Sequence, residues 1–287
     1  MTYVNPDSLV STQWVADHLD DPNVRILDGS YHLAATGRDG KAEYLASHIP
    51  GTVHFDIDAI CDPNPTPSPH MFPSAEVFAA AVSAMGITND QRVIIYDADG
   101  LFCAPRVWWM FRVFGHENVA VMSGGFRNWQ AEGRPVTTDI PSFAATSFNA
   151  SLDATKLRSI NQIRANLESE EELVLDARAA NRFDGSQPEA RAGVEPGHIP
   201  GSINLPYAGI VDAEAGTYRD ADTLRAAFDQ AGVDGSRTVA TTCGSGVTAC
   251  ILGLGMHLVG LDNWVLYDGS WTEWGSNDDT PKEKGSA

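Results

Sequence analysis

The residue whose type and position most clearly allow chemistry is Cys243. The five residues before it, 238–242, are apolar or β-branched and predict a buried strand, and residues 249–256 predict a helix. A strand, a short turn and a helix would put Cys243 at the carboxyl end of the strand, where open α/β sheets bind ligands. The turn consists of Cys243, Gly244, Ser245, Gly246, Val247 and Thr248.

The glycines of this turn predict a cradle for an anion. Gly244 and Gly246 allow successive backbone N–H groups to point at one centre, and the N-terminus of the following helix adds a partial positive charge. We expect both effects to lower the pKa of Cys243 and so to favour its thiolate. The same donors would hold a persulfide, Cys–S–S⁻, with its outer sulfur near the centre of the loop.

The turn has two other interpretations. A lone cysteine at a strand-to-helix turn can be an inert buried residue. Cradles of the tyrosine phosphatase and arsenate reductase type also begin with cysteine, but they place an arginine six residues later because its guanidinium grips the oxyanion. Here that position is Ala249, which argues strongly against both of these reactions.

The chain contains an internal repeat, which strengthens the case for Cys243. The sequence His-Ile-Pro-Gly at 48–51 recurs unchanged at 198–201, and Gly86 and Gly232 precede corresponding strands. The spacing of 146 residues between these glycines aligns Cys243 with Asp97. The first half therefore has a carboxylate where the second half has a thiol, as expected for a duplicated fold with one working cradle.

The elements that must position this turn alternate between strands and helices. In the first half we expect strands near 24–27 and 93–96 and helices near 75–85 and 104–114. Such alternation predicts an α/β fold in which each half is a parallel sheet flanked by helices on both faces. The expected division is an N-terminal domain over 1–135, a Pro- and Thr-rich linker over 136–149 and a C-terminal catalytic domain over 150–287.

Composition limits the partners of this chain. It has 287 residues, of which 43% are hydrophobic and 20% charged, as is typical of a soluble globular protein. A formal net charge of −19 makes nucleic acids and anionic membranes poor partners, so an anionic substrate would need local arginines or N–H groups. No apolar run reaches the roughly 18 residues of a membrane helix, and the first residues do not resemble a secretory signal. We therefore expect a cytoplasmic enzyme.

The cysteines give no sign of a metal site. Cys61, Cys103, Cys243 and Cys250 show neither a CxxC motif nor the paired histidines of a zinc centre. In a reducing compartment we expect free thiols. Neither a metal nor an organic cofactor is predicted.

The repeat, the duplicated His-Ile-Pro-Gly, the segment 104–112 and the Cys243 turn together resemble the tandem-domain rhodanese family over essentially the whole chain. Thiosulfate sulfurtransferases of this family typically carry Cys-Arg-Lys-Gly-Val-Thr, whose basic pair suits a dianionic donor. The turn here, Cys-Gly-Ser-Gly-Val-Thr, is similar to that of the mercaptopyruvate sulfurtransferase branch. The neutral residues suit a donor with a single carboxylate.

The resemblance also implies further site residues. Arg182 and Arg191 match two arginines that bind the carboxylate and carbonyl of mercaptopyruvate, although each could instead be a solvated loop charge. Ser245, His70 and Asp58 match a hydrogen-bond relay in which His70 moves protons and the aspartate fixes its tautomer. The Pro-rich loop 61–69 is one residue longer than the family pattern, which leaves Asp56 as an alternative to Asp58.

The activity implied is transfer of sulfur from 3-mercaptopyruvate, through a Cys243 persulfide, to cyanide or a thiol such as reduced thioredoxin, with release of pyruvate. Two alternatives remain at this point. Thiosulfate could be the principal donor at the same site. A different class is a non-catalytic sulfur carrier or binding module, whose loop docks a partner without turnover.

Overall fold

The computed structural model describes residues 2–64 and 68–286 and contains two five-stranded parallel sheets within that part of the chain. The Pro-rich loop considered above lies partly outside the described residues, at 65–67. In the first sheet the strand order is β1-β5-β4-β2-β3. Its strands are β1 (Leu9–Val10), β2 (Val24–Asp28), β3 (Val53–His54), β4 (Arg92–Tyr96) and β5 (Val119–Met122).

The second sheet repeats this topology. Its order is β6-β12-β11-β7-β8, so β4 and β11 occupy the same central place and β5 and β12 lie beside them. The duplication inferred from the sequence is therefore visible in the strand order. The strands are β6 (Leu157–Arg158), β7 (Glu172–Asp176), β8 (Ile203–Asn204), β11 (Thr238–Thr242) and β12 (Trp264–Tyr267).

Helices cover both faces of each sheet. Successive residues of a strand point to opposite sides, and in the central strands both sets are apolar, so both faces must be covered. In β4, Val93 and Ile95 belong to one apolar cluster, and Ile94 and Tyr96 belong to another. The helices of the first half are α1 (Thr12–Asp17), α2 (Gly40–Ala46), α3 (Ala75–Ala84), α4 (Ala104–Val113) and α5 (Gly125–Ala131). Those of the second half are α6 (Ile160–Ser169), α7 (Ala180–Phe183), α8 (Ala221–Gln230), α9 (Ala249–Leu258) and α10 (Ser270–Ser276). The predicted α/β architecture is confirmed.

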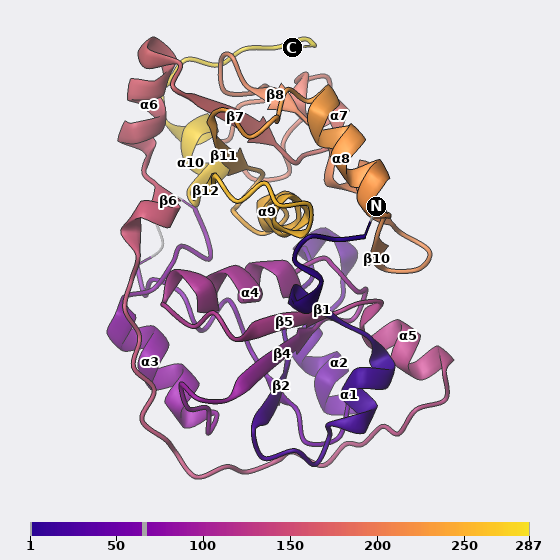
Figure 1. Ribbon diagram of the computed structural model, residues 1–287. Coiled ribbons are helices and arrows are strands. Elements are labelled where there is room, and N and C mark those ends of the chain that lie inside the picture. The colour runs from indigo at the N-terminus through magenta and orange to yellow at the C-terminus, as the bar shows by residue number, and fades with distance from the viewer. Residues whose placement is uncertain (1, 65–67, 287) are drawn as a thin grey trace.

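The two halves meet along α4 and α9, which lie side by side between the sheets (Figure 1). Every residue of α9 is buried, and in α4 only Arg112 is partly exposed. The rings of Trp109 and Trp264 stack across this seam with centroids 3.9 Å apart. Each of these helices follows the loop at the end of its own central strand, so the two loops are brought toward one interface.

A long connection joins the halves along the outer edge of the first domain (Figure 1). It runs from the end of α5 to η3 (Ala154–Lys156) and forms an isolated bridge between His48 and Thr137. The equivalent His198 forms a bridge with Glu283. The repeated histidine motif thus holds the segment that follows each domain. Smaller elements are η1 (Pro6–Ser8), η2 (Ala34–Thr36), η4 (Tyr207–Gly209), β9 (Val211–Asp212) and β10 (Thr217–Tyr218). Among the described residues no helix has the length and apolarity needed to cross a membrane.

Candidate active site

Cys243 directly follows β11 and is 2% exposed. Its loop then turns into α9, which begins at Ala249, so the predicted strand, turn and helix are all present. Gly246 has a φ of 76°, and a Cβ at this position would lie only 2.8 Å from Asp268 Oδ1. A residue with a side chain would therefore be strained at 246 and would also collide with Asp268.

The carbonyl groups of the loop are fixed from one side. The N–H groups of Trp271 and Thr272, in α10, donate to the carbonyls of Cys243 and Gly244, each at 2.9 Å. The N–H and C=O of a trans peptide point in opposite directions. The N–H groups of Gly244 and Ser245 therefore point away from α10, and within the described chain neither has a hydrogen-bond acceptor. These two groups are free to bind an anion.

One part of the expected N–H cradle differs. The hydroxyl of Ser270 accepts hydrogen bonds from the N–H groups of Cys243 and Gly246, at 3.2 and 3.0 Å, and donates to the carbonyl of Tyr267. Ser270 has a φ of 51°, which is uncommon for a residue other than glycine. The Ser270 side chain thus occupies two N–H groups of the loop, those of Cys243 and Gly246, which are then not available to the sulfur, and its own backbone is strained.

Arg182 and Arg191 lie over Gly244. A Cβ at Gly244 would be 3.3 Å from Nη2 of Arg182 and 3.7 Å from Nη1 of Arg191, so the missing side chain lets both guanidinium groups approach the loop. Arg182 pairs with Glu189 at 2.5 Å. Arg191 donates to the hydroxyls of Thr272 and Ser245, at 3.1 and 3.4 Å.

Of the three arginines that line the cavity described below, Arg178, Arg182 and Arg191, only Arg191 has no carboxylate partner among the described residues. Arg178, nearby, pairs with Asp176 at 2.7 Å and with Glu189 at 2.9 Å, so its charge is balanced. Within the described residues Arg191 contacts hydroxyls and has no carboxylate within 4.0 Å. An anionic ligand beside Cys243 would therefore find a cation and free N–H groups on the same side of the loop.

These groups line one cavity of about 200 Å³. It gathers the sequence-predicted Cys243, Gly244, Ser245, Val247, Thr248, Arg182 and Arg191. Gly246 lies beneath the loop, against Asp268, and does not line it. The first domain contributes Leu33 and Phe102, so the cavity lies between the two domains.

The first domain also supplies His70, whose ring is 4.9 Å from that of Tyr31. The carboxylate of Asp58 is 2.6 Å from His70 Nδ1, and this bond holds the pKa of Asp58 below its usual range. Asp56 instead accepts the backbone N–H of Asp58 at 3.0 Å. The structure thus pairs His70 with Asp58 and uses Asp56 to shape the turn.

Ser245 is not a hydrogen-bond partner of His70 among the described residues. The other ring nitrogen of His70, Nε2, is 3.1 Å from the hydroxyl of Tyr31, and Ser245 contacts Arg191. The relay from His70 to Ser245 therefore stays a prediction. Tyr31 was missed by the sequence argument because a lone tyrosine after a strand carries no motif.

Arg106 links these two sides of the site. Its buried guanidinium donates to Asp268 at 2.6 Å, to the carbonyl of His70 at 2.6 Å and to the carbonyl of Gly246 at 3.3 Å. A first-domain residue thus holds both the His70 segment and the Cys243 loop. No local sequence pattern indicates these partners of Arg106.

The first domain has the corresponding loop with Asp97 in the place of Cys243. Its carboxylate is buried and accepts the backbone N–H groups of Gly100, Cys103 and Ala104 at 2.5, 2.7 and 2.8 Å. The loop that would hold an anion in this domain is therefore filled by its own side chain.

The other thiols are less suited to react. Burial raises the pKa of Cys250 to about 12 and the pKa of Cys103 well above its ordinary value. Burial and three nearby aspartates also raise the pKa of Cys61. At neutral pH all three remain thiols, and a thiol is a far weaker nucleophile than a thiolate.

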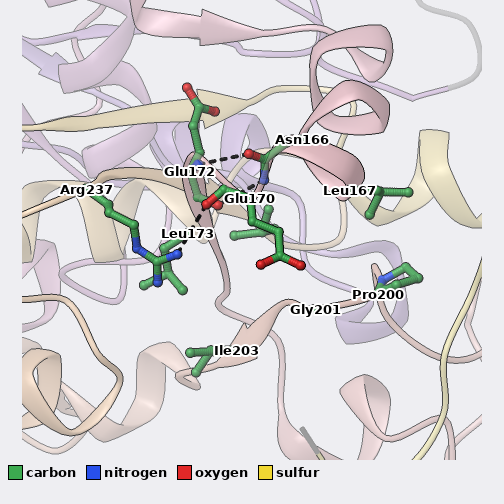
Figure 2. A pocket seen from close by; sticks show the side chains of 10 residues that line it. Asn166, Leu167, Glu170, Glu172, Leu173, Pro200, Gly201, Ile203 and Arg237 are labelled. Atoms are coloured by element: carbon green, nitrogen blue, oxygen red, sulfur yellow. Dashed lines mark hydrogen bonds between the residues drawn. The ribbon is translucent and has the colours of Figure 1, made fainter.

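A larger cavity, of about 420 Å³, lies elsewhere (Figure 2). It is bounded by Glu170, Glu172 and Arg237, at the amino end of β7 and thus at the opposite edge of the sheet from Cys243. Arg237 donates to the carbonyl of Glu170 there, at 3.4 Å. Its described lining includes no cysteine or histidine, so size alone does not identify the reactive site.

Comparisons with known proteins identify the family of this chain. The family model for the rhodanese-like domain matches residues 11–132 and 159–277. Human 3-mercaptopyruvate sulfurtransferase is 43% identical over 93% of this chain and 91% of its own, and bovine thiosulfate sulfurtransferase shows the same three values. The crystal structure of SseA from Escherichia coli, described as a 3-mercaptopyruvate sulfotransferase with the rhodanese fold, superposes with a TM-score of 0.84 at 35% identity. That match covers 92% of this chain and 98% of SseA.

Proposed function

Since the chain belongs to the rhodanese family and is a sulfurtransferase, we propose that it takes sulfur from 3-mercaptopyruvate, carries it as a persulfide on Cys243 and delivers it to a thiol. The observation that carries this proposal is the position of Arg182 and Arg191 over Gly244, beside Cys243. The two arginines provide charge for a carboxylate and a carbonyl oxygen, and the thiol lies in the same cavity.

Overall similarity does not select the sulfur donor, because the relatives named for mercaptopyruvate and for thiosulfate are equally similar. The loop does. Gly244 leaves room for Arg182, whereas a long basic side chain at this position would take that space and move the positive charge into the loop. This geometry favours a donor whose carboxylate lies away from the sulfur, as in mercaptopyruvate.

In the first half-reaction the Cys243 thiolate attacks the thiol sulfur of the donor. The carbon–sulfur bond breaks and its electron pair forms the enolate of pyruvate. The proton of the donor thiol ends on the methyl carbon of pyruvate, directly or through a relay, and Cys243 is left as a persulfide anion. The free N–H groups of Gly244 and Ser245 would hold that anion.

In the second half-reaction an acceptor thiolate attacks the outer sulfur. The sulfur–sulfur bond breaks, the electron pair returns to Cys243, and the acceptor leaves as a persulfide. We propose reduced thioredoxin as one such acceptor and the cytoplasm as the location. The free thiols Cys61, Cys103, Cys243 and Cys250 support a reducing compartment.

Thiosulfate is the second candidate donor, and the 43% identity to bovine thiosulfate sulfurtransferase favours it. The neutral Gly244 and Ser245 weigh against it, because a dianionic donor would then depend on the charge of Arg182 and Arg191 alone. We therefore rank it second.

The test is steady-state sulfur transfer to cyanide, with mercaptopyruvate and thiosulfate compared on the wild type, Cys243→Ser and the control Cys61→Ser. We expect a preference for mercaptopyruvate that Cys243→Ser abolishes and Cys61→Ser retains. A preference for thiosulfate would keep the persulfide and overturn the donor. Activity that survives in Cys243→Ser would overturn the function as a whole.

A further inference from the structure

Both ring nitrogens of His70 are engaged by groups of the first domain. Asp58 lies 2.6 Å from Nδ1, and the hydroxyl of Tyr31 lies 3.1 Å from Nε2. The imidazole is 5% exposed, and its backbone is held at a φ of 60°. His70 is thus buried, has an uncommon positive φ and has a polar first-domain group next to each ring nitrogen.

The protonation states at the two ends are set by their surroundings. Hydrogen bonding to His70 lowers the pKa of Asp58, so this group is a carboxylate at neutral pH. Burial, followed by the charge of Asp58, raises the pKa of Tyr31 to about 12, so its hydroxyl keeps its proton. The charge of the Asp58 carboxylate, 2.6 Å from Nδ1, favours a proton on that nitrogen, and Tyr31 is the one group in contact with Nε2 within the described residues.

Tyr31 belongs to a first-domain segment that reaches the Cys243 cavity, because Leu33, two residues later, lines it. The charged and titratable groups that act on its hydroxyl are Asp58, Arg191 and Cys103, besides His70 itself. Arg191 in turn contacts Ser245, in the Cys243 loop, at 3.4 Å. Arg106 donates to the carbonyls of both His70 and Gly246, so the His70–Tyr31 contact lies beside the Cys243 loop, where the donor would bind.

We propose that Tyr31 is the relay residue through which His70 passes its proton to the donor site, so that the relay runs from Asp58 through His70 to Tyr31 rather than to Ser245. This proposal rests on the proposed function, because it assigns the source of the proton taken up by the pyruvate enolate.

The proposed relay gives one proton to the enolate and regains one from the donor thiol within the first half-reaction. When His70 is an imidazolium, Nε2–H donates to the oxygen of Tyr31, whose own O–H is free to turn toward the donor site. The enolate takes the Tyr31 proton, the Nε2 proton moves to the tyrosine oxygen, and neutral His70 remains. His70 regains its proton from the thiol of the donor as the persulfide anion forms, so no further reactant is needed.

The variant Tyr31→Phe tests this because it removes a single oxygen atom. We expect kcat with mercaptopyruvate to fall about tenfold or more, while KM changes little because Arg182 and Arg191 remain. The matched control is Tyr44→Phe. Tyr44 is a buried first-domain tyrosine whose hydroxyl donates to the carbonyl of Thr52 at 2.7 Å, and its loss should leave kcat unchanged.

A double-mutant cycle separates a relay from a structural role. His70→Asn is the suitable second variant, because asparagine tolerates the positive φ at this position. If Tyr31 acts through His70, the variant Tyr31→Phe/His70→Asn should be no slower than His70→Asn alone. In a second cycle, which combines Ser245→Ala with His70→Asn, the two losses of kcat should be independent and should multiply. Additive losses for Tyr31 and His70, or a kcat for Tyr31→Phe within about twofold of the wild type, would overturn the proposal.

Mass spectrometry of Cys243 after mixing with mercaptopyruvate distinguishes the two ways of failing. A wild-type enzyme that forms no persulfide would refute the proposed function and the role of Tyr31 with it. A wild-type enzyme that forms the persulfide, with Tyr31→Phe equally fast, would refute the role of Tyr31 alone.

Discussion

Arg106 of the first domain forms a buried ion pair with Asp268 of the second, with 2.6 Å between Nη1 and Oδ1. Asp268 also accepts the N–H of Phe72 at 2.7 Å, and the guanidinium of Arg106 lies 4.2 Å from the centroid of the Phe72 ring. A buried ion pair and a backbone hydrogen bond thus join Arg106 and the segment around Phe72 to Asp268 of the second domain.

Arg106→Met should destabilise the protein strongly, because it leaves Asp268 charged and buried without its partner. We expect the free energy of unfolding to fall by about 3–5 kcal/mol. Denaturant unfolding measures this, with Arg158→Met as a control that breaks the half-buried pair with Glu172 inside one domain. The double variant Arg106→Met/Asp268→Leu should recover much of the loss. No recovery would mean that the bonds from Arg106 to His70 and Gly246 dominate instead.

Gly244→Ala should weaken binding of the donor while leaving the chemical step nearly intact. The added Cβ would lie 3.3 Å from Arg182 Nη2, which is tighter than an ordinary contact, so the guanidinium must shift by a few tenths of an ångström. We expect KM for mercaptopyruvate to rise about fivefold, on the order of 1 kcal/mol. In the control, Gly209→Ala, the new Cβ meets nothing within 4 Å. Equal kinetics for both variants would show that Arg182 does not bind the donor.

Arg191→Lys should lower the affinity for the donor although the charge is kept. A lysine has no planar fork, so it cannot contact Thr272 and Ser245 while also binding a carboxylate with two parallel bonds. KM should rise about tenfold, ~1.4 kcal/mol. Arg225→Lys, in an exposed helical pair with Asp229, provides the comparison and should match the wild type.

The strand, turn and helix around Cys243 could be predicted because each is specified by neighbouring residues. The contacts of Arg106 could not, since its partner Asp268 is 162 residues away. The backbone conformation of Ser270 is harder still to predict. Gly269 could adopt a positive φ at little cost, but its φ is −59°, and Ser270 beside it has the positive value of 51°. Tertiary hydrogen bonds to the Cys243 loop override the local preference there, and no local pattern records them.

The Asp58–His70 pair should stabilise the fold in a pH-dependent way. The pKa of Asp58 is lowered in the folded state, so its contribution is complete above the aspartate pKa of the unfolded chain, about 4, and is lost as the pH falls through the lower folded value. The stability difference between the wild type and Asp58→Asn should therefore be constant at neutral pH and shrink in acid. Unfolding curves from pH 7 down to about pH 3 measure it.

The control for this experiment is Asp56→Asn. Asp56 accepts backbone N–H groups, which the side-chain oxygen of asparagine can also do, so this variant should follow the wild-type profile. If Asp56→Asn changed the profile and Asp58→Asn did not, Asp56 would be the partner of His70 in solution.

The carboxylate of Asp97 limits how many of the two loops can hold a sulfur atom. Because this carboxylate is part of the loop whose N–H groups it binds, it occupies them without the loss of translational freedom that a dissolved anion would suffer. The loop of the first domain thus binds its own side chain, which cannot be transferred to an acceptor. If Cys243 carries the persulfide as proposed, the chain should hold one sulfur atom although it has two loops of the same design. Cyanide should then release one sulfur per chain after full loading, and not two.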